Sequence, residues 1–163
     1  MAKTYEPIAT TTLGSAAASY TFSAISSAYT DLVLVTNVKA VSSSELRIQL
    51  NSDTGTNYSF TYLSGNGTSA FSSRGSNASR IPLNAYADAS TTFAQTTISQ
   101  IMNYGNSTTY KTVITRASNA NNGVDAVVGL WRNTAAITSI NVFLATGNLD
   151  TGSTLTLYGI KAA

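Results

Sequence analysis

The sequence of 163 residues contains no cysteine and no histidine. Without cysteine, the chain can form neither a disulfide nor a thiolate metal site, and it has no thiol nucleophile. Without histidine, it lacks the commonest general base and the commonest metal ligand, which excludes Ser-His-Asp and Cys-His catalysis. Any chemistry of this protein therefore depends on hydroxyl, amide, carboxylate and a few basic side chains.

Charged residues are also scarce, at 10% of the chain against about 25% in typical soluble domains. The nine Lys and Arg are scattered, with no two adjacent, whereas nucleic-acid binders concentrate positive charge on one face. Apolar runs such as Leu32–Val35 are far too short to span a bilayer, and residues 1–12 lack the apolar stretch of a signal peptide. We expect neither nucleic acid nor membrane as a partner.

Carboxylates are too few and too scattered to suggest a catalytic pair. Glycosidases need two carboxylates facing each other across a cleft, but only two Glu and five Asp are present, and the Asp residues mostly lie in turn-like contexts. Residues 51–57 (NSDTGTN) place oxygen side chains at alternate positions, as a Ca²⁺ loop does. A single carboxylate and no distal Glu favour an ordinary turn there. We expect no enzyme, no cofactor, and no catalytic, cofactor-binding or metal-binding residues.

Strand signals recur along the chain between clusters of Gly, Asn, Asp and Ser. The alternation in Glu45–Leu50 predicts one buried face, formed by Leu46, Ile48 and Leu50. The same alternation predicts burial of Ile140, Val142 and Leu144. The predicted strands are 5–12, 19–22, 31–39, 45–50, 58–63, 93–102, 109–116, 125–132, 137–145 and 153–161.

The intervening segment Ser64–Ser90 has a weak pattern and is predicted to be a long excursion rather than part of the core, with at most a turn or two of helix at Leu83–Ala89. No stretch has a convincing helical period. Short strands with a turn about every ten residues predict an all-β fold, an antiparallel β-sandwich of the jelly-roll kind with eight to ten strands. We expect one domain over residues 1–163.

The candidate interface combines an apolar strand with loop tyrosines. The run Leu32–Val35 is apolar on both faces, which predicts that one face packs in the core and the other meets a neighbour. Phe60, Tyr62, Trp131 and Tyr158 lie at strand positions and are expected to fill the core. Four other tyrosines lie nearer to loops. The candidate interface residues are Leu32, Val33, Leu34, Val35, Tyr20, Tyr29, Tyr86 and Tyr104.

Five groups of residues are distinctive when taken in order. They are YEPIATTTL at 5–13, NYS at 57–59 with LSGNG at 63–67, IMNY at 101–104 with TTYKT at 108–112, GLWR at 129–132 with AITSI at 136–140, and GSTLTLYGIK at 152–161. Together they resemble a family of small β-sandwich virion proteins of tailed phages, especially phages of cyanobacteria and other aquatic bacteria. The resemblance covers nearly the whole chain, and residues 69–89 are the least similar.

The resemblance implies a structural part of a virion and transfers no catalytic residue. We expect a capsid decoration (cement) protein on the outer surface of the phage head, which binds the major capsid protein as a homotrimer. The alternative is a tail-fibre or receptor-binding module that recognises host surface glycan. A carbohydrate-binding module detached from a bacterial enzyme is a third reading. A one-domain chain that begins at its own Met favours the first, and the missing signal peptide counts against the third.

Overall fold

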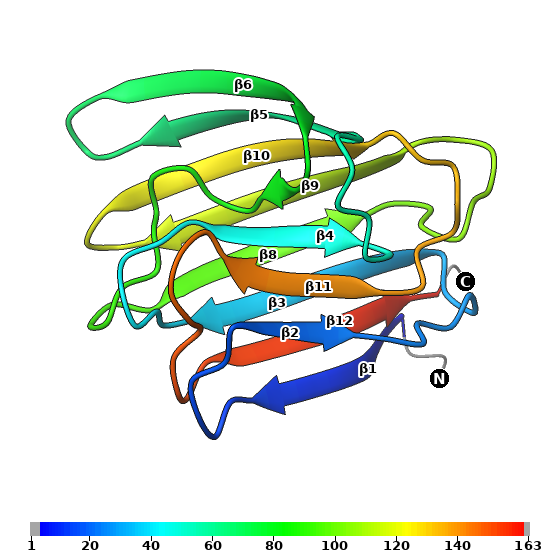
Figure 1. Cartoon of the computed structure of the whole chain (residues 1–163), viewed down its shortest axis with the longest axis horizontal. Helices are drawn as coiled ribbons and strands as arrows, with labels where there is room; N and C mark the ends of the chain where they lie inside the picture. The colour runs from blue at the N-terminus through cyan, green and yellow to red at the C-terminus, as the bar shows by residue number, and fades with distance from the viewer. Residues whose placement is uncertain (1–3, 162–163) are drawn as a thin grey trace.

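The computed structural model describes residues 4–161, which form twelve β-strands in two sheets and no helix (Figure 1). None of these residues belongs to a helix long and apolar enough to cross a membrane. The strands are β1 (Tyr5–Thr12), β2 (Ser19–Phe22), β3 (Asp31–Val38), β4 (Leu46–Leu50), β5 (Tyr58–Gly65), β6 (Ala70–Ala78), β7 (Ile81–Pro82), β8 (Gln95–Ile101), β9 (Lys111–Asn119), β10 (Gly123–Trp131), β11 (Ile140–Leu144) and β12 (Thr154–Ile160).

The strand order is that of a rolled-up hairpin. The larger sheet has the order β1-β12-β3-β8-β9-β10-β5-β6, and the smaller has β2-β11-β4-β7. Thus β1 pairs with β12, β2 with β11, β3 with β8, and β4 with β7, all antiparallel. These four nested pairs alternate between the two sheets, which defines a jelly roll. The predicted antiparallel β-sandwich is confirmed, with twelve strands rather than eight to ten.

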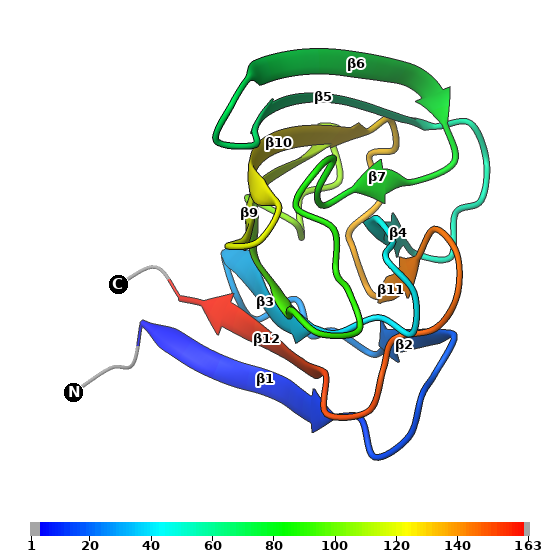
Figure 2. The same cartoon turned by 90° about the vertical axis from the view of Figure 1, so that its left-hand side faces the viewer.

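Two additional hairpins account for the extra strands. The hairpin β5–β6 lies between β4 and β7 in the chain, and β9–β10 lies between β8 and β11. Strand β10 pairs with both β9 and β5, so the two hairpins join into four strands that widen the larger sheet past the smaller one (Figure 2). The prediction that Ser64–Ser90 lies outside the core is wrong, because this segment completes β5, contains β6 and β7, and places Ile81, Leu83 and Ala89 in the core cluster.

The core between the sheets follows the predicted alternation. Leu46, Ile48, Ile140, Val142 and Leu144 are buried, as expected. They pair across β4 and β11 in register, with Val142 opposite Ile48 and Leu144 opposite Leu46. The facing side of the larger sheet contributes further leucines to the same hydrophobic cluster. These are Leu32, Leu34, Leu155 and Leu157.

Residues 79–94 cover the inner face of the widened part of the larger sheet. The backbone of Gly129 lies so close to Ile81 that a Cβ atom at position 129 would be 2.3 Å from Cγ2 of Ile81. The carboxylate of Asp125 accepts hydrogen bonds from the backbone N–H groups of Ala85 and Ala87, both at 2.9 Å. The inner face of β9, β10 and β5 is thereby covered, and only the outer face remains open.

Candidate functional site

The outer side of the widened sheet exposes aliphatic side chains. Leu63 is 59% exposed, Ile114 48%, Val124 60% and Val128 43%. The solvated face of an antiparallel sheet is ordinarily polar, and clustered exposed apolar residues mark interaction sites. We define the outer apolar face as Leu63, Ile114, Arg116, Val124, Ala126 and Val128, from strands β5, β9 and β10.

The strand register places a single cation at the centre of this surface. Across the sheet, Arg116 of β9 lies opposite Ile98 of β8 on one side and Ala126 of β10 on the other. Ala126 in turn lies opposite Leu63 of β5. Along its own strand, Arg116 is two residues from Ile114, which points to the same side. The side chain of Arg116 is therefore flanked by aliphatic residues on its own strand and on both neighbouring strands.

The outer side of the widened sheet is hollowed in three places, with volumes of about 580, 350 and 510 Å³. Leu63, Arg116 and Ala126 line the first two hollows, so these form one continuous depression over β9, β10 and β5. The third hollow adjoins it at Thr61 and Val128 and reaches Arg74 of β6. Residues pointing outward from the described strands β8, β9, β10 and β5 include no aromatic side chain. A depression of this composition suits the aliphatic side chains of another protein, and it lacks the flat rings on which sugars stack.

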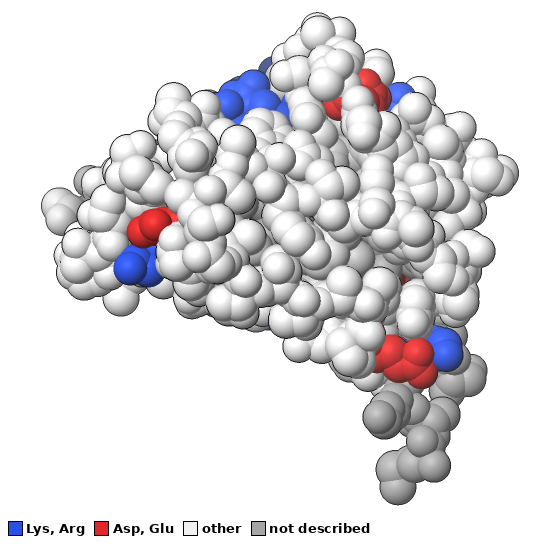
Figure 3. Space-filling model, turned by 60° about the horizontal axis from the view of Figure 1, so that its bottom comes forward, with Lys and Arg blue, Asp and Glu red and all other residues white. Residues whose placement is uncertain are grey.

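Charge is sparse elsewhere on the surface too. On the side of the molecule drawn in Figure 3, charged groups are few and separated by wide uncharged areas. Two ion pairs occur among the described residues, Arg47 with Glu45 at 2.5 Å and Lys161 with Glu6 at 3.2 Å. Neither pair lies on the outer apolar face, which has no carboxylate.

The predicted interface at Leu32–Val35 lies largely inside the molecule. Leu32 and Leu34 point into the core, and Val33, on the opposite face of β3, is only 4% exposed. Val35 is half-buried and pairs with Ile98 at the margin of the outer apolar face. The run is indeed apolar on both faces, but residues of the same chain cover most of it.

The four loop tyrosines have different surroundings. Tyr104 is buried, and its hydroxyl donates a hydrogen bond to the carbonyl of Ser26, which corrects its assignment to a contact surface. Tyr20 and Tyr29 are half-buried. The ring of Tyr29 packs on Gly159, where a Cβ atom would be 2.3 Å from it. Tyr86 alone stays exposed.

The side chains expected in the core divide similarly. Trp131 is buried, whereas Phe60, Tyr62 and Tyr158 are half-buried. The loop 51–57 is an ordinary Asx-rich turn: the carboxylate of Asp53 accepts hydrogen bonds from Trp131 Nε1 at 2.7 Å, Asn57 Nδ2 at 2.9 Å and the backbone N–H of Gly55 at 2.8 Å. Residues 4–161 contain no group of three or more carboxylates placed to hold a metal ion.

A signal for the outer apolar face was present in the sequence. Residues 126–131 (AVVGLW) form an apolar run in which both faces of β10 are apolar. Alternation identifies only the inward set, which includes Val127 and Trp131, as a core face. The outward residues of β10 form an apolar surface only together with Leu63 and Ile114. These two residues are brought beside β10 by the register of β5 and β9, which the sequence pattern of β10 does not contain.

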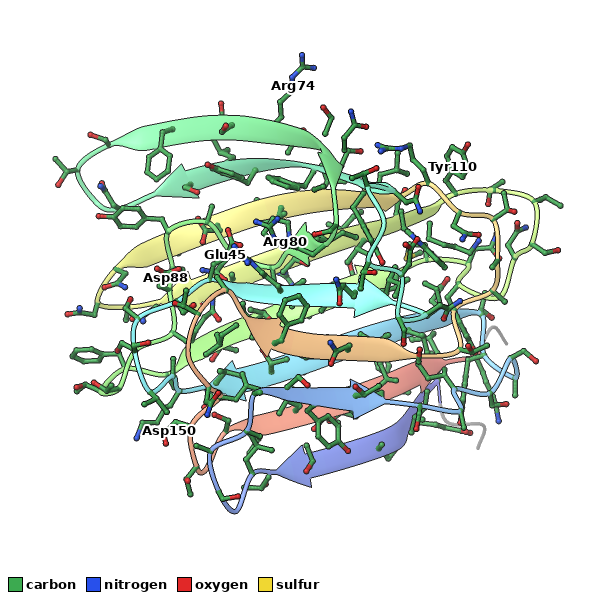
Figure 4. The ribbon with its side chains drawn as sticks, in the orientation of Figure 1. Glu45, Arg74, Arg80, Asp88, Tyr110 and Asp150 are labelled. Carbon is green, nitrogen blue, oxygen red and sulfur yellow. The ribbon has the colours of Figure 1, made fainter. Side chains whose placement is uncertain are left out.

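A half-buried acidic group near the inner side of the same sheet, Asp88, gives a pH-dependent prediction. Burial raises the pKa of Asp88, the negative charges of Glu45 and Asp125 raise it further, and the hydrogen bond from Asn84 Nδ2 (2.7 Å) opposes the rise. Glu45 and Asp88 are labelled in Figure 4. Because the folded pKa exceeds the ordinary value of 3.8, ionised Asp88 destabilises the fold at neutral pH, and acidification removes the penalty.

We therefore expect Asp88→Asn to unfold at a higher temperature than the wild type at pH 7. The asparagine keeps an oxygen that can accept from Asn84 and carries no charge. Below the unfolded pKa both proteins are neutral at this position, so the difference should vanish near pH 3. Thermal unfolding followed by circular dichroism at both pH values measures this. A lower unfolding temperature at pH 7, or the same difference at both pH values, would contradict the assignment.

Comparisons with known proteins add little to this geometry. No family model matches the chain, and no curated protein matches it. Among solved structures, the galectin LEC-6 of Caenorhabditis elegans is similar, with a TM-score of 0.40 and 8% sequence identity, covering 94% of this chain and 96% of that one. A similarity of this degree supports no inference about ligand or function. The strand order itself defines the class, which is an antiparallel β-sandwich of the jelly-roll kind.

Proposed function

We propose that this protein is a structural component of a phage virion, a decoration protein that binds the outside of the capsid. The observation that carries the proposal is the outer apolar face, an aliphatic depression on the widened part of the larger sheet. The ordered resemblance of five groups of residues to virion proteins of tailed phages supports the same class. In this proposal the protein acts by binding another protein and catalyses no reaction.

The size of the outer apolar face fits a contact that is weak for one copy of the protein and strong when several linked copies bind together. Three strands about 4.8 Å apart and about seven residues long at ~3.3 Å each give a face of roughly 330 Å². A standard interface buries about 800 Å² per partner, so a single copy would bind weakly. Three linked copies raise the effective concentration at the second and third contacts. We therefore propose a homotrimer, because closed cyclic assembly is a common way to repeat one contact.

The aliphatic character of the depression favours a protein partner over the glycan of a tail-fibre module. A receptor-binding module would need flat aromatic or hydrogen-bonding side chains converging on a sugar. The exposed Tyr86 packs edge-to-face against Phe71, with 5.5 Å between ring centroids. This ring pair lies on β6 and the 79–94 segment rather than among the outward residues of β5, β9 and β10.

The test uses particles of the phage that encodes the chain, prepared with its gene deleted. Purified protein is added back, and the particles are examined by cryo-electron microscopy. We expect density for the protein at repeated positions over the head, and native mass spectrometry of the free protein should give three times the chain mass. Density confined to the tail tip, on a head that is complete without it, would replace this proposal with receptor binding.

A further inference from the structure

Two exposed arginines on the outer side of the larger sheet have no acidic partner. Among the described residues, neither Arg74 of β6 nor Arg116 of β9 takes part in an ion pair or a side-chain hydrogen bond. Their surroundings differ. Arg74 projects into solvent from the edge strand (Figure 4), opposite Thr61 of β5. Arg116 lies within the aliphatic depression, so it would become buried if that depression were covered.

A buried arginine needs a carboxylate, and none of the carboxylates among the described residues is fully exposed or belongs to the outer apolar face. All seven Asp and Glu lie within residues 4–161, and each accepts a hydrogen bond from its own chain. A second copy packed face to face on the outer apolar face would bring another Arg116 and no carboxylate, so both guanidinium groups would be left uncompensated. Covering a charge without a partner costs several kcal/mol, which disfavours self-association through this surface.

We infer that the outer apolar face docks on a different protein, at a site where one Asp or Glu is surrounded by aliphatic side chains, and that Arg116 pairs with this carboxylate. The inference rests on the proposed function and assigns the contact to the capsid shell. Leu63, Val124 and Val128 would supply the apolar contact area. Homotrimer contacts would then use other surfaces, which leaves this depression free to face the shell.

Arginine suits this task because its planar guanidinium forms two parallel hydrogen bonds with one carboxylate. Aliphatic neighbours exclude water from the pair, so a misplaced or absent carboxylate leaves a charge unpaired. The arrangement therefore fixes orientation and rejects surfaces without the acid, while apolar burial supplies much of the attraction. A lysine at position 116 would keep the positive charge but could not donate two parallel hydrogen bonds to one carboxylate, so it would retain only part of the binding.

Binding to gene-deleted heads is measured for the wild type, Arg116→Glu, Arg116→Lys and Arg74→Glu. We expect Arg116→Glu to weaken binding by about 30-fold or more, because it sets two carboxylates against each other in the covered contact. Arg116→Lys should fall between this variant and the wild type. Arg74→Glu makes the same charge change on the edge strand β6, in the adjoining hollow and away from Arg116 and Leu63, and we expect less than about a threefold loss for an exposed charge. Thermal unfolding establishes that all four proteins are folded.

A second matched pair tests the apolar part of the contact. Val124→Asp lies in the depression, whereas Val41→Asp replaces a valine that is 50% exposed and lies outside the two sheets. Only the first should abolish binding. A photo-crosslinking residue at Leu63 should then label a segment of the shell protein that contains Asp or Glu among aliphatic residues. Exchange of that acid for Lys should restore binding of Arg116→Glu.

The outcomes separate this inference from the proposed function. If the wild type binds heads and Arg116→Glu binds equally well, the assignment of Arg116 is wrong while the decoration role stands. If Val124→Asp and Arg116→Glu change the oligomeric mass but not head binding, the surface is an interface between copies. If the wild type does not bind heads, the proposed function itself fails.

Discussion

Replacing Asp125 by alanine is expected to lower the free energy of unfolding by about 3–5 kcal/mol, because it leaves several buried donors unpaired. Asp125 lies on the inner face of β10 and is 4% exposed. Its carboxylate accepts the hydroxyl of Ser64 at 2.5 Å and three successive backbone N–H groups, those of Ala85, Tyr86 and Ala87. This one side chain thus fastens the 79–94 segment to the larger sheet.

The variants Asp125→Asn and Asp150→Ala serve as graded controls. The asparagine side chain in the first variant would keep one acceptor oxygen and lose the charge, so about half of the loss is expected. Asp150 is half-buried in a turn, where its carboxylate accepts only the N–H of Thr151 (2.8 Å), and its removal should cost less than about 1 kcal/mol. Urea unfolding followed by the fluorescence of Trp131, the single tryptophan, measures all three. A loss below about 1 kcal/mol for Asp125→Ala would mean that the segment is held by other contacts.

The sequence predicted most strands but not β6, because the strands differ in how much of their surface is buried. Strands such as β4 and β11 bury one whole face, so apolar residues recur at every second position. Strand β6 lies at the edge of the larger sheet, and its central residues Ser72, Ser73 and Arg74 are exposed. Apolar and polar residues do not alternate along these positions. The segment is a strand because its backbone pairs with β5. A two-residue strand such as β7 is too short to show any period.

Loop position was an equally poor guide to exposure. Tyr104 lies in the connection between β8 and β9, yet it is buried and belongs to the core cluster. The backbone explains this, because the N–H of Ile137 donates to the carbonyl of Tyr104 at 3.0 Å and draws the two connections together. That contact joins residues far apart in the chain, and no local pattern encodes it. The outer apolar face could not be predicted from the sequence for the same reason, since its residues come together only when β5, β9 and β10 pair.

Trp131 is the second single side chain that we expect to contribute a large part of the stability, because it packs at the junction of β10 and β5. Trp131 is buried at the end of β10 and stacks on its cross-strand partner Tyr58, with 6.4 Å between centroids and 18° between planes. Burial raises the pKa of Tyr58 to about 12, so its hydroxyl stays protonated and donates to the carbonyl of Asp53 at 3.0 Å. The same pairing of β10 with β5 carries Leu63 to the outer apolar face, so Trp131 also supports the proposed contact surface.

We expect Trp131→Ala to lower the free energy of unfolding by about 3–5 kcal/mol, the usual cost of removing a buried tryptophan. Trp131→Phe keeps most of the packing but removes the indole N–H that donates to Asp53 Oδ2 at 2.7 Å, and should cost about 1.5–3 kcal/mol. The hydrogen bond is isolated by a double-mutant cycle of Trp131→Phe with Asp53→Ala, which removes the acceptor, followed by circular dichroism because the tryptophan probe is lost. A coupling energy of about 1 kcal/mol or more is expected for a directly bonded pair. Strictly additive losses would show that the indole stabilises the fold through packing alone, and that the 51–57 turn is held by its own hydrogen bonds to Asn57 and Gly55.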